Sequence, residues 1–304
     1  MTIEQDSLFI PYLDGKLHLR QIRPVDADMS KPPIFMLHGA MSNGRVFYSD
    51  NGKGLACFLA ASGFVVYVLD IHGRGLSTPK LQRGSKPGQG QVIRDQLPLI
   101  HHFIISLHPG VSQIHWCGHS WGGVLMASAI SRYPLFQDCV ASLLTFGSKR
   151  QIKVKSLKKW LMVDIGWNKL APAIAWSHGY LAADRWRMGM DNESRASLSQ
   201  SIDWVRGDWV DHDDGFDYGK SAANIARQDK WPKAWFIAGQ GDDVLGHPED
   251  VFRMLQECQF ADFKYTLLSK EQGYKHDYGH ADMLTHKDAA DDHFRQVKQW
   301  YQGL

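Results

Sequence analysis

The protein has 304 residues, of which 44% are hydrophobic and 22% are charged, a composition typical of globular rather than disordered proteins. Its net charge of +2 lacks the basic excess of nucleic-acid-binding proteins, so we expect no nucleic-acid partner. No apolar run approaches the roughly 18 residues of a membrane span, and the first residues lack the apolar core of a secretory signal.

The four cysteines are far apart and include no CxxC pair, which argues against both a disulfide framework and a zinc cluster. We therefore expect a cytoplasmic protein with reduced thiols. The oligomeric state is left open.

The first predicted elements are two strands, Ser7–Leu13 and Lys16–Ile22, joined by a hairpin turn at Asp14-Gly15. Strands and helices then alternate. Further strands are predicted at Ile34–Leu37, Phe64–Leu69, Ile114–Cys117, Val140–Phe146, Ala234–Ala238 and Phe263–Leu268. Helices are predicted at Gly54–Ser62, Val92–Leu107, Val124–Ile130, Glu249–Cys258 and Lys287–Tyr301.

Each of these later strands is a continuous apolar run, which is typical of a parallel sheet covered by helices on both faces. The alternation stops between Gly147 and Trp231, a segment that contains seven of the eleven tryptophans. The pattern predicts an α/β fold with a mostly parallel central sheet. Residues 1–147 and 233–304 would form the core, and residues 148–232 a mostly helical cap inserted between strands.

The segment Gln113–Gly123 (QIHWCGHSWGG) combines a predicted strand, a tight glycine turn and the start of a helix. A G-x-S-x-G motif in this context presents its serine at the carboxyl edge of the sheet. Gly118 and Gly122 allow the strand and the helix to approach closely because they lack Cβ atoms. Ser120 is therefore the candidate nucleophile.

A serine hydroxyl needs a base, and the base needs an acid that orients it. These groups can meet only at the carboxyl ends of the strands. The turn after Ala234–Ala238 offers Asp242 and Asp243, and the loop after Phe263–Leu268 offers His276 and His280. The order serine, aspartate, histidine is the one expected on an α/β sheet.

With these motifs the chain resembles the α/β-hydrolase family over nearly its whole length. His38-Gly39 resembles the oxyanion loop of this family, and Asp70–Ser77 resembles its D-x-R-G-x-G-x-S loop, with His72 in place of the usual arginine. Gly118–Gly122 matches the nucleophile turn, Gly239–Asp242 the turn that carries the acid, and Gly279-His280 the loop that carries the base. The N-terminal half is most similar to the monoacylglycerol-lipase and acid-lipase types.

The resemblance implies a catalytic triad of Ser120, Asp242 and His280, in preference to Asp243 and His276. It implies an oxyanion hole formed by the backbone N–H groups of Trp121 and Ala40, with Met41 as a weaker candidate donor. His38 is expected to brace its loop. No cofactor and no metal are expected.

These residues predict an esterase or lipase that hydrolyses small-molecule carboxylic esters with an apolar acyl group of medium or long chain, through an acyl-enzyme. One alternative is an aminopeptidase of the proline-iminopeptidase type, which would need acids in the cap, where Glu193 is the only glutamate. Another is a non-catalytic ligand-binding relative.

The cap tryptophans could line an acyl pocket or form the core of the cap. The basic run Lys149–Lys159 is expected to be a solvated helix face. An amphipathic helix resting on a lipid surface is its less favoured alternative, so membrane contact is not expected.

Overall fold

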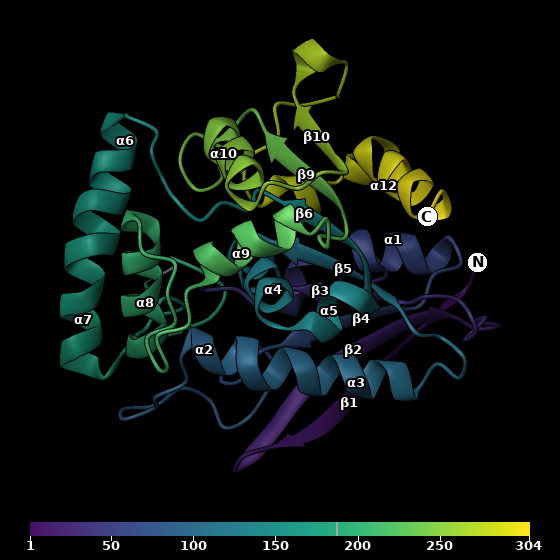
Figure 1. The fold of residues 1–304 in the computed structure, drawn as a ribbon, viewed down its shortest axis with the longest axis horizontal. Coiled ribbons are helices and arrows are strands. Elements are labelled where there is room, and N and C mark those ends of the chain that lie inside the picture. The colour runs from purple at the N-terminus through teal and green to yellow at the C-terminus, as the bar shows by residue number, and fades with distance from the viewer. Residues whose placement is uncertain (187) are drawn as a thin grey trace.

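An eight-stranded sheet forms the centre of the computed structural model, which describes residues 1–186 and 188–304 (Figure 1). The strand order is β1-β2-β4-β3-β5-β6-β9-β10, and the first two pairings are antiparallel while the rest are parallel. The strands are β1 (Ile3–Tyr12), β2 (Gly15–Pro24), β3 (Ile34–Leu37), β4 (Val66–Asp70), β5 (Ile114–His119), β6 (Val140–Phe146), β9 (Lys233–Gly239) and β10 (Phe263–Leu268). The mostly parallel sheet predicted from the apolar runs is confirmed.

Helices cover both faces of this sheet (Figure 1). One face packs against α1 (Leu55–Ala61) and α12 (His293–Gln302). The other packs against α3 (Leu97–Ser106), α4 (Trp121–Arg132), α5 (Pro134–Cys139), α9 (Tyr218–Arg227) and α10 (Pro248–Cys258). Two short helices, α2 (Gln89–Gln91) and α11 (Asp282–Thr285), lie at the ends of loops, and a π-helical stretch, Val92–Gln96, joins α2 to α3.

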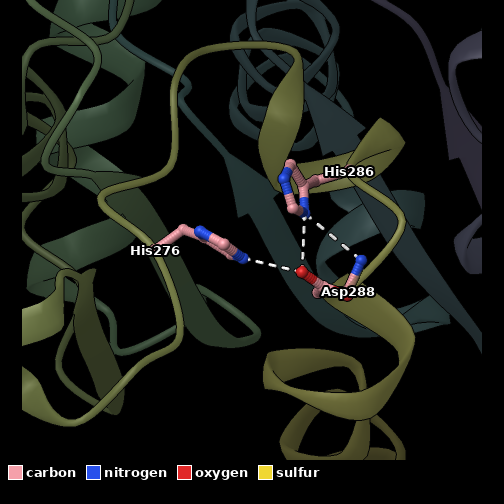
Figure 2. A group of neighbouring side chains, drawn as sticks. All are labelled: His276, His286 and Asp288. Carbon is pink, nitrogen blue, oxygen red and sulfur yellow. Dashed lines mark hydrogen bonds and ion pairs between the residues drawn. The ribbon is translucent and has the colours of Figure 1, made fainter.

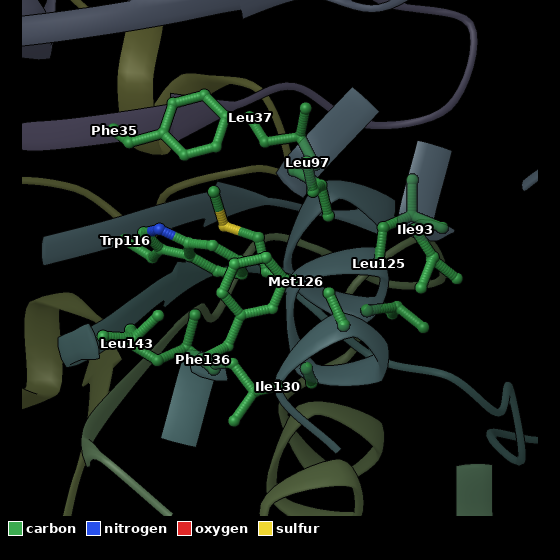
Figure 3. Close-up of a cluster of buried hydrophobic side chains, with 14 of the residues drawn as sticks. Phe35, Leu37, Ile93, Leu97, Trp116, Leu125, Met126, Ile130, Phe136 and Leu143 are labelled. Atoms are coloured by element: carbon green, nitrogen blue, oxygen red, sulfur yellow. The ribbon is translucent and has the colours of Figure 1, made fainter. Parts of the chain in front are cut away.

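The larger core is centred on α4, which is buried from Trp121 to Ser131 (Figure 3). Met126 of this helix lies among Trp116 of β5, Phe136 of α5 and Leu37 of β3 in one cluster of buried side chains. Burying side chains of this size stabilises the fold by about 1.5–3 kcal/mol each. The helix that carries the candidate nucleophile at its start is therefore firmly anchored.

Residues 148–232 are mostly helical. They contain α6 (Leu157–Lys159), a π-helical stretch (Trp160–Leu170), α7 (Ala171–His178), the two-residue strands β7 (Tyr180–Leu181) and β8 (Glu193–Ser194), α8 (Arg195–Arg206) and α9. A small apolar core holds α7 and α8 together, and it consists of Ala171, Ala175, Leu181, Ala183, Leu198 and Ile202. The limits of the cap at 148 and 232 stay a prediction.

The basic run is not a solvated helix face, and that prediction is wrong. Residues 149–155 have no helical structure, and Lys149 and Arg150 are buried. The Arg150 guanidinium contacts the Glu257 carboxylate and the Trp204 carbonyl, so its charge is compensated inside the protein. Helix α6 begins only at Leu157.

The closing helix begins at His293 rather than at Lys287. The Asp292 carboxylate accepts hydrogen bonds from the Lys275 amide (2.9 Å) and the Tyr278 hydroxyl (2.8 Å), which holds Asp292 in a non-helical conformation. The same bonds tie the start of α12 to the predicted base loop.

The tryptophans of residues 148–232 lie in different environments, and neither role considered for them is tested. Trp204, Trp209 and Trp231 are buried in the main core, whereas Trp160, Trp176 and Trp186 are exposed. None of the helices among the described residues combines the length and the apolar character needed to cross a bilayer.

Candidate active site

Ser120 lies on the turn between β5 and α4, as the glycine motif predicted. Its backbone is at φ 52° and ψ −123°, a conformation rare for a residue with a side chain. A Cβ atom on Gly122 would lie 2.3 Å from the Leu37 carbonyl, so only glycine permits this close approach of helix and strand. The turn presents Ser120 at the N-terminus of α4, where the helix dipole favours developing negative charge.

Asp242 and His280 form a hydrogen-bonded pair at the same edge of the sheet. Asp242 follows β9 and is buried, and its Oδ2 atom lies 2.5 Å from Nδ1 of His280. This contact fixes which imidazole nitrogen carries the proton and leaves Nε2 available to accept one. Of the two aspartates in the turn, Asp243 is exposed and forms an ion pair with Lys158 at 2.8 Å.

The Ser120 and His280 side chains are not hydrogen-bonded to each other in this structure. Such bonds often form only once substrate is bound. Ser120 is only 8% exposed, so little of the candidate nucleophile is accessible to solvent.

His119 holds the base loop in a way that the sequence did not reveal. Its Nε2–H donates to the His280 carbonyl (3.2 Å), and its ring packs on the His280 ring with 4.9 Å between centroids. Because His119 directly precedes Ser120, this contact packs the nucleophile turn and the base loop against each other as one unit.

Burial and neighbouring charges tune the titrating groups of this unit. Burial tends to raise the pKa of Asp242, but its hydrogen bond with His280 and the charge of Lys149 hold that pKa below the ordinary value. Burial lowers the pKa of His119 to about 3 and that of Lys149 to about 8. Asp242 is therefore ionised and His119 neutral near pH 7.

The predicted oxyanion loop lies directly against the nucleophile. A Cβ atom on Gly39 would be 2.8 Å from the Ser120 Cβ. The Met41 amide donates to the Glu193 carboxylate (3.3 Å), whereas the amides of Ala40 and Trp121 have no acceptor among the described residues. The two amides that the resemblance implied as donors therefore remain free for a substrate oxygen.

His38 braces this loop through hydrogen bonds, as expected. Its Nδ1–H donates to the Gly39 carbonyl (2.9 Å), and its Nε2 accepts from the Ile71 amide (3.3 Å). Burial, aided by the charge of Arg74, lowers the His38 pKa to about 4, which keeps the ring in the neutral form that this pattern requires.

Glu193, the first residue of β8, and Asp191 just before it contact two loops of the sheet domain. Glu193 is buried and forms an ion pair with Arg74. Asp191 accepts a hydrogen bond from the Gly75 amide (2.5 Å) and one from the Asn43 side chain (3.3 Å). Nothing in the sequence signals these contacts, because their partners lie more than 100 residues apart.

We predict that Asp242→Asn lowers kcat by about 10⁴-fold, because an asparagine favours the wrong histidine tautomer. Asp243→Asn, the matched control in the same turn, should retain most activity since it removes only a surface ion pair. Steady-state kinetics of both variants test this. Equal losses would mean that the acid has been assigned to the wrong carboxylate.

Acid pH should destabilise the fold. Burial is the main factor that lowers the pKa of His38, His101, His115 and His293 to about 4, and that of His119 to about 3. Because these values lie below that of an unfolded histidine, about 6.5, the unfolded state binds more protons between the two values. The stabilisation is therefore complete above about pH 6.5 and is lost as the pH falls towards 4.

At about pH 5 each of these histidines should reduce the free energy of unfolding by about 2 kcal/mol. Together they rival the whole stability of a typical domain. Urea unfolding followed by circular dichroism should thus show a steep fall in stability between pH 6.5 and 5. A free energy of unfolding that is constant over this range would contradict the predicted burial of neutral imidazoles.

A parallel sheet with helices on both faces, a serine on a tight strand–helix turn and an aspartate–histidine pair at the carboxyl ends of its strands is the arrangement of an α/β hydrolase. Residues 30–268 match the model of the family described as "Serine aminopeptidase, S33", and the chain belongs to this hydrolase family. A search of the curated proteins found no match.

Solved structures share the fold over almost the whole chain. A soluble variant of monoglyceride lipase from Saccharomyces cerevisiae superposes with a TM-score of 0.69 at 14% identity, covering 99% of this chain and 95% of that one. The monoacylglycerol lipase of Paleococcus ferrophilus gives 0.59 at 14% identity, covering 94% and 98%. The enol-lactonase of Burkholderia xenovorans gives 0.57 at 16% identity, covering 98% and 100%. At these identities the likeness shows the fold alone.

Proposed function

We propose that this protein is a serine hydrolase of small-molecule carboxylic esters with an apolar acyl group, acting through Ser120, His280 and Asp242. The pairing of Asp242 with His280 at 2.5 Å, at the sheet edge that bears the strained Ser120 turn, is the chief support. We expect the reaction to need no cofactor and the protein to be cytoplasmic.

In the proposed reaction His280 Nε2 accepts the Ser120 proton as Oγ attacks the ester carbonyl carbon. The amides of Ala40 and Trp121 stabilise the resulting oxyanion. His280 then protonates the departing alcohol, leaving an acyl group on Ser120. A water molecule, deprotonated by His280, releases the acid and restores the enzyme, while Asp242 stabilises the imidazolium formed in each half-reaction.

Ester hydrolysis is favoured over aminopeptidase activity by the contacts of Glu193 and Asp191, the cap acids that reach the loops beside the nucleophile. An aminopeptidase needs a free carboxylate near the nucleophile to bind the substrate ammonium group. Glu193 is already engaged by Arg74 and by the Met41 amide, and Asp191 by the Gly75 amide. These two carboxylates fasten the cap and are not free to bind an ammonium group.

The apolar side chains next to the oxyanion loop favour a substrate with an apolar acyl group. Met41, next to Ala40, packs against the small apolar core of the cap, which includes Leu198 and Ile202. Burial of an acyl chain there would contribute about 0.8 kcal/mol per methylene group. We therefore expect catalytic efficiency to increase with acyl length.

A panel of nitrophenyl esters of increasing acyl length, compared with aminoacyl anilides, tests the proposal on the purified protein. Esters should be hydrolysed, and the Ser120→Ala variant should hydrolyse none of them. Turnover of the anilides alone would support the aminopeptidase alternative. No turnover of either class would support a non-catalytic ligand-binding relative.

A further inference from the structure

Three side chains that the proposed reaction does not use gather beside the base loop. His276 lies four residues before His280, and His286 and Asp288 follow α11 on its other side. Figure 2 shows the two imidazoles and the carboxylate pointing toward one another. The segment that carries His280 therefore has this cluster at both of its ends.

The distances within the cluster match those between the ligands of a small metal ion. Asp288 Oδ2 lies 2.8 Å from His276 Nε2 and 3.8 Å from His286 Nδ1, and all three ligand atoms lie within 4.8 Å of one another. Around a tetrahedral zinc ion with bonds of roughly 2.0–2.1 Å, neighbouring ligands are about 3.3 Å apart. The observed distances bracket this value, so an ion needs only small side-chain movements to bind.

The chemistry of the ligands selects the kind of ion. Two imidazoles and one carboxylate suit zinc and similar transition metals, whereas magnesium and calcium prefer oxygen ligands. We propose that His276, His286 and Asp288 form a zinc-type site in which a water molecule would complete the tetrahedron.

Neighbouring side chains hold the two histidines of the cluster in place before an ion binds. The ring of Tyr278 is buried and packs edge-on against both His276 (5.6 Å, 83°) and His286 (5.6 Å, 88°). Its hydroxyl is fixed by Asp292 at 2.8 Å. The three ligands are half-buried, so an ion can enter from solvent while the rings keep their orientation.

Zinc binding would replace two hydrogen bonds within the cluster. The hydrogen bond between His276 Nε2 and Asp288 must give way to metal coordination, so the proton on this nitrogen leaves to solvent or moves to Nδ1. The Asp288 amide, now 3.2 Å from His286 Nδ1, must release that nitrogen. Three metal–ligand bonds take their place.

An ion in this site would join the two ends of the segment that carries His280. Its binding would therefore stabilise the folded base loop without contributing a group to the proposed reaction. This separates the site from the triad, and each can be tested without the other.

Titration calorimetry and thermal unfolding with zinc chloride as the probe test the site on the purified full chain. We expect one zinc ion to bind per chain and to raise Tm on the order of 5 °C when present in about 100-fold excess over its Kd. The same amount of magnesium chloride should have no effect.

The variants His276→Ala and Asp288→Asn should lose this binding, and His280→Ala should keep it, which excludes zinc bound at the triad. His212→Ala is the matched control, because it removes a histidine–aspartate pair (3.3 Å to Asp203) that has no third ligand among the described residues. Unchanged zinc affinity in both His276→Ala and Asp288→Asn, or no zinc binding to the wild-type chain, would overturn the proposal.

Discussion

Replacing Ser120 with alanine should lower kcat for nitrophenyl esters by about a millionfold, to the level left by substrate binding and the oxyanion donors alone. The reason is that no other hydroxyl lies on the strained turn between β5 and α4. Steady-state kinetics with a high enzyme concentration measures the residual rate.

The loss should occur without unfolding. Alanine keeps the Cβ atom of Ser120 and removes only the hydroxyl oxygen, so Tm should stay close to that of the wild type. Ser131→Ala is the control in the helix that follows, because among the described residues the Ser131 hydroxyl bonds only to the Ser128 carbonyl (2.9 Å). Wild-type rates in Ser120→Ala would place the nucleophile elsewhere.

The second large effect is expected at the base. His280→Ala should reduce ester turnover about as severely as Ser120→Ala, since the members of a triad act as a unit. His276→Ala should retain most activity because His276 contacts Asp288 at 2.8 Å rather than Asp242. Measuring kcat for both variants decides between the two histidines.

If His276→Ala proved the more damaging of the two, the imidazole next to Asp242 would not be the base. The pH dependence of kcat/KM provides a second test of which variant has lost the base. An active histidine base makes kcat/KM rise with pH as the imidazole loses its proton. A weakened variant that keeps this rise still has its base.

The parallel sheet could be predicted from sequence because its strands are local apolar runs. Val140–Phe146 and Phe263–Leu268 were predicted with the limits that β6 and β10 have. The Ser120 turn was equally predictable, since its glycines encode a close approach between neighbouring elements.

Contacts between distant residues could not be predicted in this way. Arg150 is buried against Glu257, 107 positions away, yet its sequence context is a run of cations that suggests a solvated surface. Likewise nothing near Glu193 in sequence indicates that Arg74 will neutralise it. Such pairs arise only when the fold brings their partners together.

The prediction that the last helix begins at Lys287 was wrong for a related reason. Between residues 287 and 292 only the 3-10 turn Ala289–Asp291 forms, and the hydrogen bonds that Asp292 accepts from Lys275 and Tyr278 hold it out of the helix. Local propensity is a weak preference that tertiary contacts of this kind outweigh.

Covalent labelling tests the proposed function most directly. A fluorophosphonate probe reacts with a serine only when a base has activated it and oxyanion donors receive the phosphoryl oxygen. After digestion and mass spectrometry, the probe should be found on Ser120 of the wild-type protein, and the label should disappear in Ser120→Ala. A label on another serine, or an active enzyme that takes up no label, would contradict Ser120 as the nucleophile.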